Sequence, residues 1–223
     1  MTVTAAVQAY LGAHPFIEEA LTDGIINYAG LARHMHNDIQ QITDRDVKSG
    51  AIIMALKRLS PSYYYRVQSG IKQFFERIGP FTVRSDISDY TFQNTSSLLQ
   101  QQKIIMDRVA HDSSSFYSFS MGLHESTIVA SNNLDQTIAN VLGEEKMISK
   151  RTALATLTTL LPKENTELSG IYYFIFKQLA CQDINVVEVI STTNEFTVVV
   201  GEKDIDRSFR LLRQLKRPSA KLD

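Results

Sequence analysis

The chain has 223 residues, of which 43% are hydrophobic and 21% charged, and its formal net charge is −1. This composition is ordinary for a globular protein, and the near-neutral charge argues against nucleic-acid binding by bulk charge. No apolar run approaches the roughly 20 residues that span a bilayer, and residues 1–10 lack the basic and apolar regions of a secretory signal. The single cysteine, Cys181, excludes an intramolecular disulfide. We therefore expect a cytoplasmic protein in which Cys181 lies on a helix as a small buried residue.

Residues 1–79 have a helical pattern. Apolar residues recur there at helical spacing, most clearly Leu31, Met35 and Ile39, which are four residues apart. Gly, Pro and Asp residues bound the elements. The pattern predicts helices at residues 1–11, 16–21, from about 28, 47–59 and 71–78, with a polar turn at 43–46 and a strand at 63–67. Gly79-Pro80 follows and is the predicted domain boundary.

The two helices on either side of the polar turn form a predicted helix-turn-helix, and with the strand as a wing they resemble a winged-helix module. In DNA-binding modules of this kind, the second helix presents its first residues to the major groove. The candidate nucleic-acid contacts are therefore Arg45, Lys48, Ser49, Lys57 and Arg58. However, the segment contains about as many acids as bases, and Lys57 and Arg58 also suit the negative end of a helix. DNA and a protein partner both stay open for this module.

After Pro80 the chain shows the order strand–helix–strand–strand–helix–strand, which then begins again. The first copy, residues 80–151, has predicted strands at 81–92, 116–122, 127–130 and 147–151 and helices at 95–111 and 134–142. The second copy, residues 152–216, has predicted strands at 153–161, 186–191 and 196–200 and helices at 170–182 and 203–215, and residues 217–223 are predicted to be a disordered tail. Each copy is thus a ferredoxin-like βαββαβ unit with two helices on one sheet face, and the fold class is α+β.

The second copy carries detail beyond its pattern. Ser169-Gly170-Ile171 opens its first helix, Ile184-Asn185 opens its second strand, and Ile190-Ser191-Thr192 precedes the strand that ends at Val200. With Asp206-Arg207 and Leu211-Leu212 in the closing helix, residues 153–215 resemble ACT domains of the aspartokinase type, and residues 81–151 resemble them in pattern only. The resemblance implies a regulatory region whose paired units bind a small amino acid, with homodimerisation and allostery.

Two features depart from the family pattern. The second copy lacks a strand after its closing helix, because the chain turns polar at Lys216. An uncovered sheet edge invites association, so we expect the strand near Phe81 or another subunit to complete the sheet, and the interleaved units of aspartokinases favour the first. Aspartokinases also carry a kinase domain, whereas the segment before Pro80 has no glycine-rich phosphate loop. The resemblance therefore implies the regulatory part alone, with no cofactor.

The chemistry of an amino acid selects the candidate ligand residues. Backbone N–H groups at a helix start attract a carboxylate, and strand carbonyls or an Asn side chain can hold an ammonium. The candidates are Ser169, Gly170, Ile171 and Asn185 in the second copy and Asn94, Thr95 and Ser96 in the first. Each also has a structural explanation, because Gly170 and Asn185 suit turns and residues 94–96 suit a helix N-cap.

No catalytic or metal-binding pattern accompanies these residues. His34 and His36 point to different faces of a helix, Asp86 and Asp89 have no evident acid–base partner, and residues 113–115 lack the setting of a nucleophilic serine. Three hypotheses follow: a non-enzymatic regulator in which an amino acid signals to the N-terminal module, a structural or dimerising protein with degenerate ACT units, and a ligand-responsive DNA-binding regulator. We expect no membrane partner.

Overall fold

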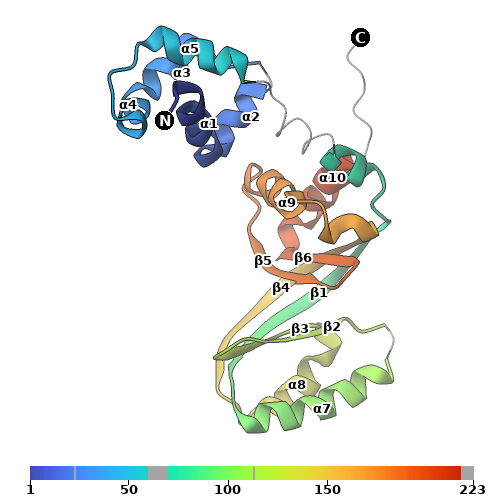
Figure 1. The fold of residues 1–223 in the computed structure, drawn as a ribbon. Helices are drawn as coiled ribbons and strands as arrows, with labels where there is room; N and C mark the ends of the chain where they lie inside the picture. The colour runs from blue at the N-terminus through green and yellow to red at the C-terminus, as the bar shows by residue number, and fades with distance from the viewer. Residues whose placement is uncertain (23, 60–69, 113, 217–223) are drawn as a thin grey trace. The chain divides into compact units, whose positions relative to one another are not determined.

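A computed structural model describes residues 1–22, 24–59, 70–112 and 114–216 (Figure 1). The chain divides into two compact units, Met1–Ile71 and Lys72–Asp223. The division falls before the predicted boundary at Gly79-Pro80, because residues 72–78 pack on the second unit. The Phe75 ring packs at a tilt against the Phe174 ring, with centroids 5.4 Å apart, and the Gly79 N–H donates to the Leu160 carbonyl at 2.7 Å. The helix that includes residues 70–76 therefore belongs mostly to the second unit.

The N-terminal unit is a cluster of short helices around one apolar core. Its helices are α1 (Val3–Ala13), α2 (Pro15–Thr22), α3 (Tyr28–His34), α4 (His36–Thr43) and α5 (Ser49–Arg58). The apolar stripe predicted from Leu31, Met35 and Ile39 is buried in that core together with Ile52 and Leu56. The single helix predicted from Tyr28 is in fact two, because the backbone at Met35 departs from helical geometry, with φ −88° and ψ 1°.

The turn between α4 and α5 is sharp, since Asp44 takes a left-handed conformation with φ 51°. The helices therefore follow one another as a helix–turn–helix in the chain. The predicted wing strand at residues 63–67 lies outside the described residues, so the winged-helix arrangement stays a prediction. None of the helices in the described part of the chain is long and apolar enough to cross a membrane.

The second unit is built on one six-stranded antiparallel sheet with the order β2-β3-β1-β4-β6-β5. The strands are β1 (Phe81–Gln93), β2 (Tyr117–Met121), β3 (Glu125–Ser131), β4 (Met147–Leu160), β5 (Val186–Ser191) and β6 (Glu195–Gly201). The helices are α7 (Ser96–Ala110), α8 (Asp135–Leu142), α9 (Ile171–Ala180) and α10 (Ile205–Leu215), with 3₁₀ turns η1 (Asn132–Leu134), η2 (Lys163–Thr166) and η3 (Glu202–Asp204).

Two long strands are shared between the two predicted copies. In Figure 1, β1 and β4 run side by side from the part of the unit that holds α7 and α8 to the part that holds α9 and α10. We call these parts the first half and the second half. The segment Phe81–Arg84 of β1 pairs with Thr156–Thr159 of β4, which pairs in turn with β6. The strand near Phe81 therefore completes the second sheet within the chain, as predicted.

The predicted division at residues 151 and 152 falls inside one continuous strand, because β4 has no break there. Both long strands carry a bulge where they pass from one half to the other. Ser85 and Asp86 lie opposite the single residue Ala155, and Ser88 lies opposite Thr152 and Ala153. Asp86 and Ala153 have φ values of 55° and 54°, which is the left-handed region that β-strand residues normally avoid. Such bulges bend a strand and increase its twist.

The helices cover one face of each half. In the first half, Tyr90, Phe92 and Ile128 of the sheet pack with Leu98 and Ile105 of α7 and with α8. The opposite, helix-free faces of the two halves meet in a small core of Ile87, Val129, Leu154 and Val199, against which Phe116 and Ile190 pack. This small core, to which both halves contribute residues, lies between the two halves of the curled sheet.

Cys181 is exposed, so the expectation that it is buried was wrong. The residues of α9 that face the core are Ile171, Ile175 and Leu179, at steps of four residues. Cys181 is the C-cap of the helix. Two residues beyond Leu179, a helical position has turned by roughly 200° and points away from the core.

Candidate functional site

A cavity of about 350 Å³ lies between the two halves of the second unit. A single cross-strand row, Thr82, Thr158, Thr197 and Ile190, forms its floor, since each of these residues pairs with the next across β1, β4, β6 and β5. The Thr158 and Thr197 hydroxyls lie 2.7 Å apart. The wall is supplied by the start of β2 in the first half, with Phe116, Tyr117 and Ser118. The site is therefore made by both halves.

Two residues of opposite charge stand at the cavity. Arg84 of β1 lines it on one side, and Glu195 at the start of β6 lines it on the other together with Thr192. The Arg84 Nη1 donates to the Ser114 carbonyl at 2.8 Å, which directs the guanidinium toward the first half. The backbone of Glu195 is fixed by the hairpin, because its N–H donates to the Thr192 hydroxyl at 3.1 Å and its carbonyl accepts from the Thr192 N–H at 2.9 Å.

A second cross-strand row lies on the same face of the sheet, two residues along the strands from the first, and most of its side chains are also polar. It consists of Arg84, Thr156, Val199 and Glu188, which are again direct cross-strand partners. The Thr156 side chain is fully buried, and its hydroxyl has no hydrogen-bond partner in the described part of the protein. A buried hydroxyl without a partner costs free energy unless water or a ligand satisfies it. The interior beside the cavity thus has unused hydrogen-bonding capacity.

Two carboxylates of this inter-half layer, Asp89 and Glu188, interact electrostatically. Asp89 of β1 is 2% exposed, and its Oδ1 has no partner among the described residues. Burial raises the pKa of the Asp89 carboxyl, and the positive charge of Arg151, its cross-strand neighbour, offsets only part of that rise. Burial and the negative charge of Asp89 raise the pKa of Glu188. Both shifts favour the protonated, uncharged form of these two carboxyls.

The predicted helix-start residues of the second half keep open backbone groups. Gly170 is the N-cap of α9 with φ 92°, and no side chain caps this helix start. Ser169 is exposed, whereas the Ile171 side chain is buried and serves the core. Only backbone N–H groups of this segment are thus available for a carboxylate.

The structure does not bring Asn185 to that helix start. Asn185 is exposed and immediately precedes β5, after the turn that follows the C-terminal end of α9. The 10 residues of α9 separate its two ends, which corresponds to roughly 15 Å. Gly170 offers only its backbone and Asn185 a short side chain, so these two residues do not reach across that separation to the same small ligand within one chain.

The predicted residues of the first half serve local structure. The Thr95 hydroxyl accepts from the Leu98 N–H at 3.0 Å as the N-cap of α7 and donates to the Glu145 carboxylate at 2.7 Å. The Asn94 amide donates to the Gly122 carbonyl at 2.9 Å and accepts from the Ser126 hydroxyl at 2.6 Å. Ser96 is exposed at the first position of the helix. A hollow of about 470 Å³ beside Asn94 is lined by Gln93, Leu123, His124, Glu125, Lys146 and Ile148.

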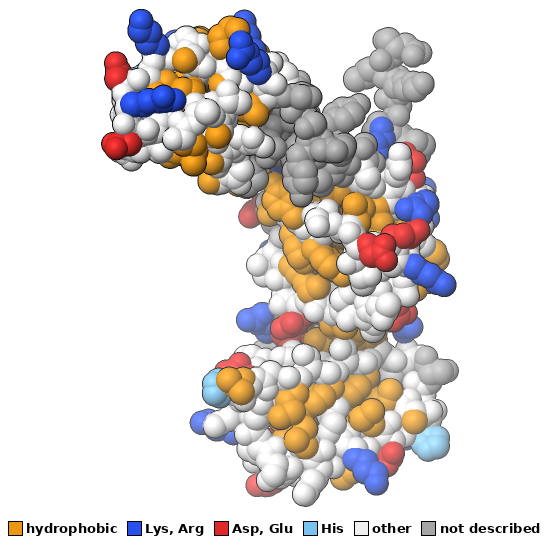
Figure 2. Space-filling view, viewed as in Figure 1, with side chains coloured by type: hydrophobic (Ala, Val, Ile, Leu, Met, Phe, Trp, Pro, Cys, Tyr) orange, Lys and Arg blue, Asp and Glu red, His pale blue; other side chains and the backbone are white. Residues whose placement is uncertain are grey.

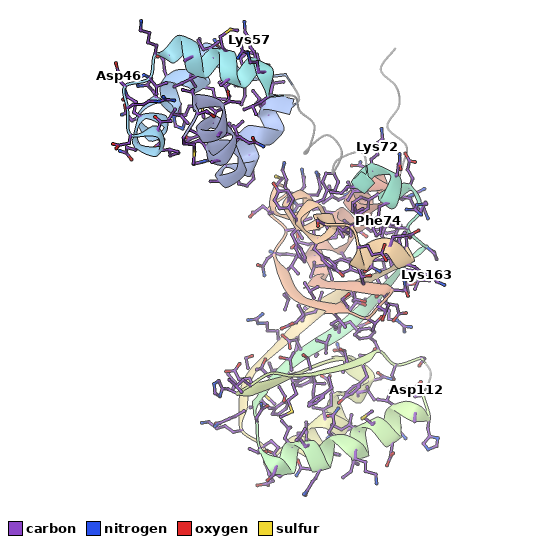
Figure 3. All side chains as sticks on the ribbon, in the orientation of Figure 1. Asp46, Lys57, Lys72, Phe74, Asp112 and Lys163 are labelled. Carbon is purple, nitrogen blue, oxygen red and sulfur yellow. The ribbon has the colours of Figure 1, made fainter. Side chains whose placement is uncertain are left out.

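The residues predicted to contact nucleic acid lie along α5 and the turn before it. Lys48 and Ser49 begin the helix, and Lys57 and Arg58 occupy its last turn, where positive charge interacts favourably with the helix dipole (Figure 3). Arg45 donates from its Nη2 to the Met1 carbonyl at 3.2 Å. The face of this unit drawn in Figure 2 carries acidic as well as basic side chains. These positions stay predictions.

The cavity residues were not predicted from the sequence. Thr82, Thr158 and Thr197 come from three strands that are far apart in the chain, so no local motif joins them. One residue could have indicated this site in the sequence: Thr197 places a hydroxyl between apolar residues of a strand that is buried on both faces. Among the described residues, no group of three or more His, Cys, Asp or Glu side chains is placed to hold a metal ion.

No protein-family model matches the sequence, and no curated protein matches it. Solved structures do match the fold. Aspartate kinase from Clostridium acetobutylicum, described as an allosteric enzyme, is 12% identical with a TM-score of 0.50, over 61% of this chain and 34% of that chain. The regulatory subunit of aspartate kinase from Thermus thermophilus is 10% identical with a TM-score of 0.47, over 61% of this chain and 97% of that chain.

A third match is E. coli aspartokinase III in complex with lysine and aspartate, which is 10% identical with a TM-score of 0.47, over 64% of this chain and 34% of that chain. This chain thus spans about a third of the two larger kinases, but nearly all of the Thermus regulatory subunit. At such low identity the likeness extends to the fold alone.

Proposed function

We propose that the protein is a non-catalytic regulator whose interleaved ACT-like unit binds a small amino acid and signals to the N-terminal unit. The observation that carries the proposal is the interleaving itself, in which β1 and β4 each belong to both halves. The same fold occurs in the C. acetobutylicum aspartate kinase, an allosteric enzyme. The resemblance of residues 153–215 to the aspartokinase type of ACT domain supports the same function.

Contacts at the entry of the second unit support the signalling step. The helix of residues 70–76 contacts α9 through Phe75 and Phe174, and Phe74, labelled in Figure 3, is fully buried beside it. Gly79 is joined to the end of β4 through Leu160. A Cβ at Gly79 would lie 2.8 Å from the Leu160 side chain, so this approach is close. These contacts support the proposal that a movement of α9 or β4 would reach the segment that leads to the N-terminal unit.

Thermal unfolding of the full chain with each of the twenty amino acids in turn tests the binding step. A ligand that binds only the folded state at 100 times its Kd stabilises that state by about 2.7 kcal/mol, so the melting temperature should rise with the concentration of one or a few amino acids. If none of the twenty raises it, the protein does not sense a free amino acid and this proposal fails.

Amide hydrogen exchange tests the signalling step with the amino acid that gives the largest shift. Coupling between two sites requires that the ligand change the equilibrium of both, so we expect altered exchange in α1 to α5 as well as at the second unit. Altered exchange confined to residues 72–216 would leave binding intact and remove the signalling role.

Self-association is a second candidate function, and the two free sheet edges favour it. The strand order leaves β2 and β5 as edges in the described sheet. β5 also exposes Val189 at 42%. Unpaired edges are templates for pairing with another chain, so a homodimer in which the unit is only a platform predicts an oligomer whose size is unaffected by any amino acid. Sedimentation with and without amino acids separates the two functions.

A further inference from the structure

We propose that the cavity between the halves holds the free zwitterion of an α-amino acid, with Arg84 binding its carboxylate and Glu195 its ammonium. This inference rests on the proposed amino-acid-binding function. It places the ligand away from the helix starts that the sequence predicts, and it makes the site dependent on both halves of the unit.

The two ends of the cavity select a molecule with one charge of each sign. A guanidinium carries five N–H donors in a planar fork that suits a carboxylate, and one of those on Arg84 is held by the Ser114 carbonyl. The Glu195 carboxylate is an acceptor that suits an ammonium. A simple anion would be opposed by Glu195, and a simple cation by Arg84, so a zwitterion is favoured over either.

The spacing between the two charges fits a single small molecule. Glu195 lies two strands away from Arg84 and four residues along β6 from Val199, which is in the Arg84 row. Strand spacing of about 4.8 Å and a rise of about 3.3 Å per residue place their Cα atoms roughly 16 Å apart. Side chains that bend toward each other leave room between their head groups for one amino acid. The cavity volume of about 350 Å³ is at the small end of the range for ligand sites.

The floor and wall give the ligand both hydroxyls and apolar surface. Thr82, Thr158 and Thr197 present hydroxyl-bearing side chains in one row, and Phe116 and Ile190 present apolar ones. Hydroxyls both donate and accept, so they can complete the hydrogen bonds of a bound carboxylate or ammonium. A ligand here would also exclude water from the space in front of the row that contains the unpartnered Thr156 hydroxyl.

Calorimetric titration of the full chain tests the assignment by removing each charge from the ligand and from the protein. The titrants are the amino acid with the largest thermal shift, its carboxamide and its N-acetyl derivative. Loss of one charge-assisted hydrogen bond weakens binding by roughly 10- to 100-fold. We expect Arg84→Gln to weaken the parent amino acid by that factor and to leave the carboxamide unaffected. Glu195→Gln should weaken the parent in the same way and leave the N-acetyl derivative unaffected.

Matched variants separate a site in the cavity from a site elsewhere on the protein. Arg77→Gln removes another exposed guanidinium, one that pairs with Glu164 at 3.1 Å and lies outside the cavity lining, so it should not change affinity. Asn185→Ala tests the position predicted from the sequence and should also bind normally. Arg84 and Glu195 are exposed, so their variants should fold.

The outcomes distinguish the inference from the function on which it rests. Binding that is lost in Asn185→Ala and unchanged in both cavity variants would overturn the cavity assignment while amino-acid sensing stands. Cavity variants that weaken the parent and both derivatives equally would also overturn it, because the charges would then act indirectly. If no amino acid binds the unaltered protein, sensing itself fails.

Discussion

Replacement of Ala153 by valine has opposite expected effects on stability, depending on whether the left-handed backbone at Ala153 or the strand propensity of valine dominates. Ala153 is exposed in β4 with φ 54°. In an ordinary exposed strand position, valine is neutral or stabilising relative to alanine. In the left-handed region, a Cβ approaches the following carbonyl, which costs roughly 1–2 kcal/mol, and a β-branched side chain adds to this clash. Ala153 already bears this Cβ, so only the added β-branched clash distinguishes valine. We therefore expect Ala153→Val to lower the free energy of unfolding by about 1 kcal/mol, with no packing gain to offset it.

The urea midpoint and the melting temperature measure the effect. For a unit of this size, a loss of about 1 kcal/mol lowers the melting temperature by roughly 2–4 °C. Thr152→Val is the matched control, because Thr152 is an exposed neighbour in the same strand without a positive φ, and it should change stability by less than about 0.5 kcal/mol. Ala153→Gly should be neutral or stabilising, since relief of the clash opposes the entropy cost of glycine, about 0.5–1 kcal/mol. An Ala153→Val protein as stable as the control would refute the bulge in β4.

Three further changes test the contacts between the halves and the start of α7. Leu154→Ala removes a side chain that is 5% exposed in the core shared by the two halves, and it should lower the free energy of unfolding by about 2–5 kcal/mol. Val189→Ala, at an exposed sheet edge, should lower it by less than about 0.5 kcal/mol. Equal losses of stability in urea unfolding would mean that the halves do not pack at Leu154. Because the pKa values of Asp89 and Glu188 are raised from 3.8 and 4.5, their contribution to stability is full below those values and is lost as pH rises through the raised values. Asp89→Asn should flatten this fall of the urea midpoint as pH rises above about pH 4. An unchanged profile would contradict the burial of the Asp89 carboxyl. Thr95→Ala removes the cap that accepts from the Leu98 N–H and should cost about 1 kcal/mol, measured by thermal unfolding; no loss would show that the cap is dispensable.

Local pattern predicted most elements of the second unit because their side chains report directly on burial. Residues 81–92 were predicted as a strand and form β1, although its exposed and buried positions occur in runs and do not alternate. The buried positions of α7 and α9 repeat at three- and four-residue steps, as predicted. Periodicity of this kind reflects which face packs on a core. The strand β6 was expected to be buried on both faces and is.

The continuity of β4 was missed for a physical reason. Lys150, Arg151, Thr152 and Ala153 are exposed or partly exposed in the middle of the strand, where it passes between the halves and no helix covers it. The sequence predicted strands on both sides, at 147–151 and 153–161, but this polar stretch was interpreted as the boundary between the two copies. Only the pairing with β1, at residues about 60 positions earlier, identifies it as a strand, and such distant partners leave no local trace.

The cavity between the halves was not predicted from the sequence, and the helix-start positions stay predictions. The helix-start argument rests on one general property of backbone N–H groups, and every helix has such a start. The cavity depends instead on which side of each strand faces the other half. A shift of one residue in register would turn Thr158 and Thr197 to the opposite face. The bulges at Asp86 and Ala153 set that orientation, and the sequence shows neither.

The shared strands also explain why a ligand in the cavity would have effects beyond its own contacts. Arg84 lies two residues before Asp86, at which β1 leaves the second half for the first. A ligand that joins Arg84 to the Glu195 hairpin therefore fixes β1 at its bulge, against the wall that begins at Phe116. Because β4 also crosses between the halves and ends at Leu160, where it binds Gly79, the same restraint extends to the segment that enters from the N-terminal unit. If the proposed ligand binds there, the two crossing strands offer a route by which a local charge contact would reach the connection between the units.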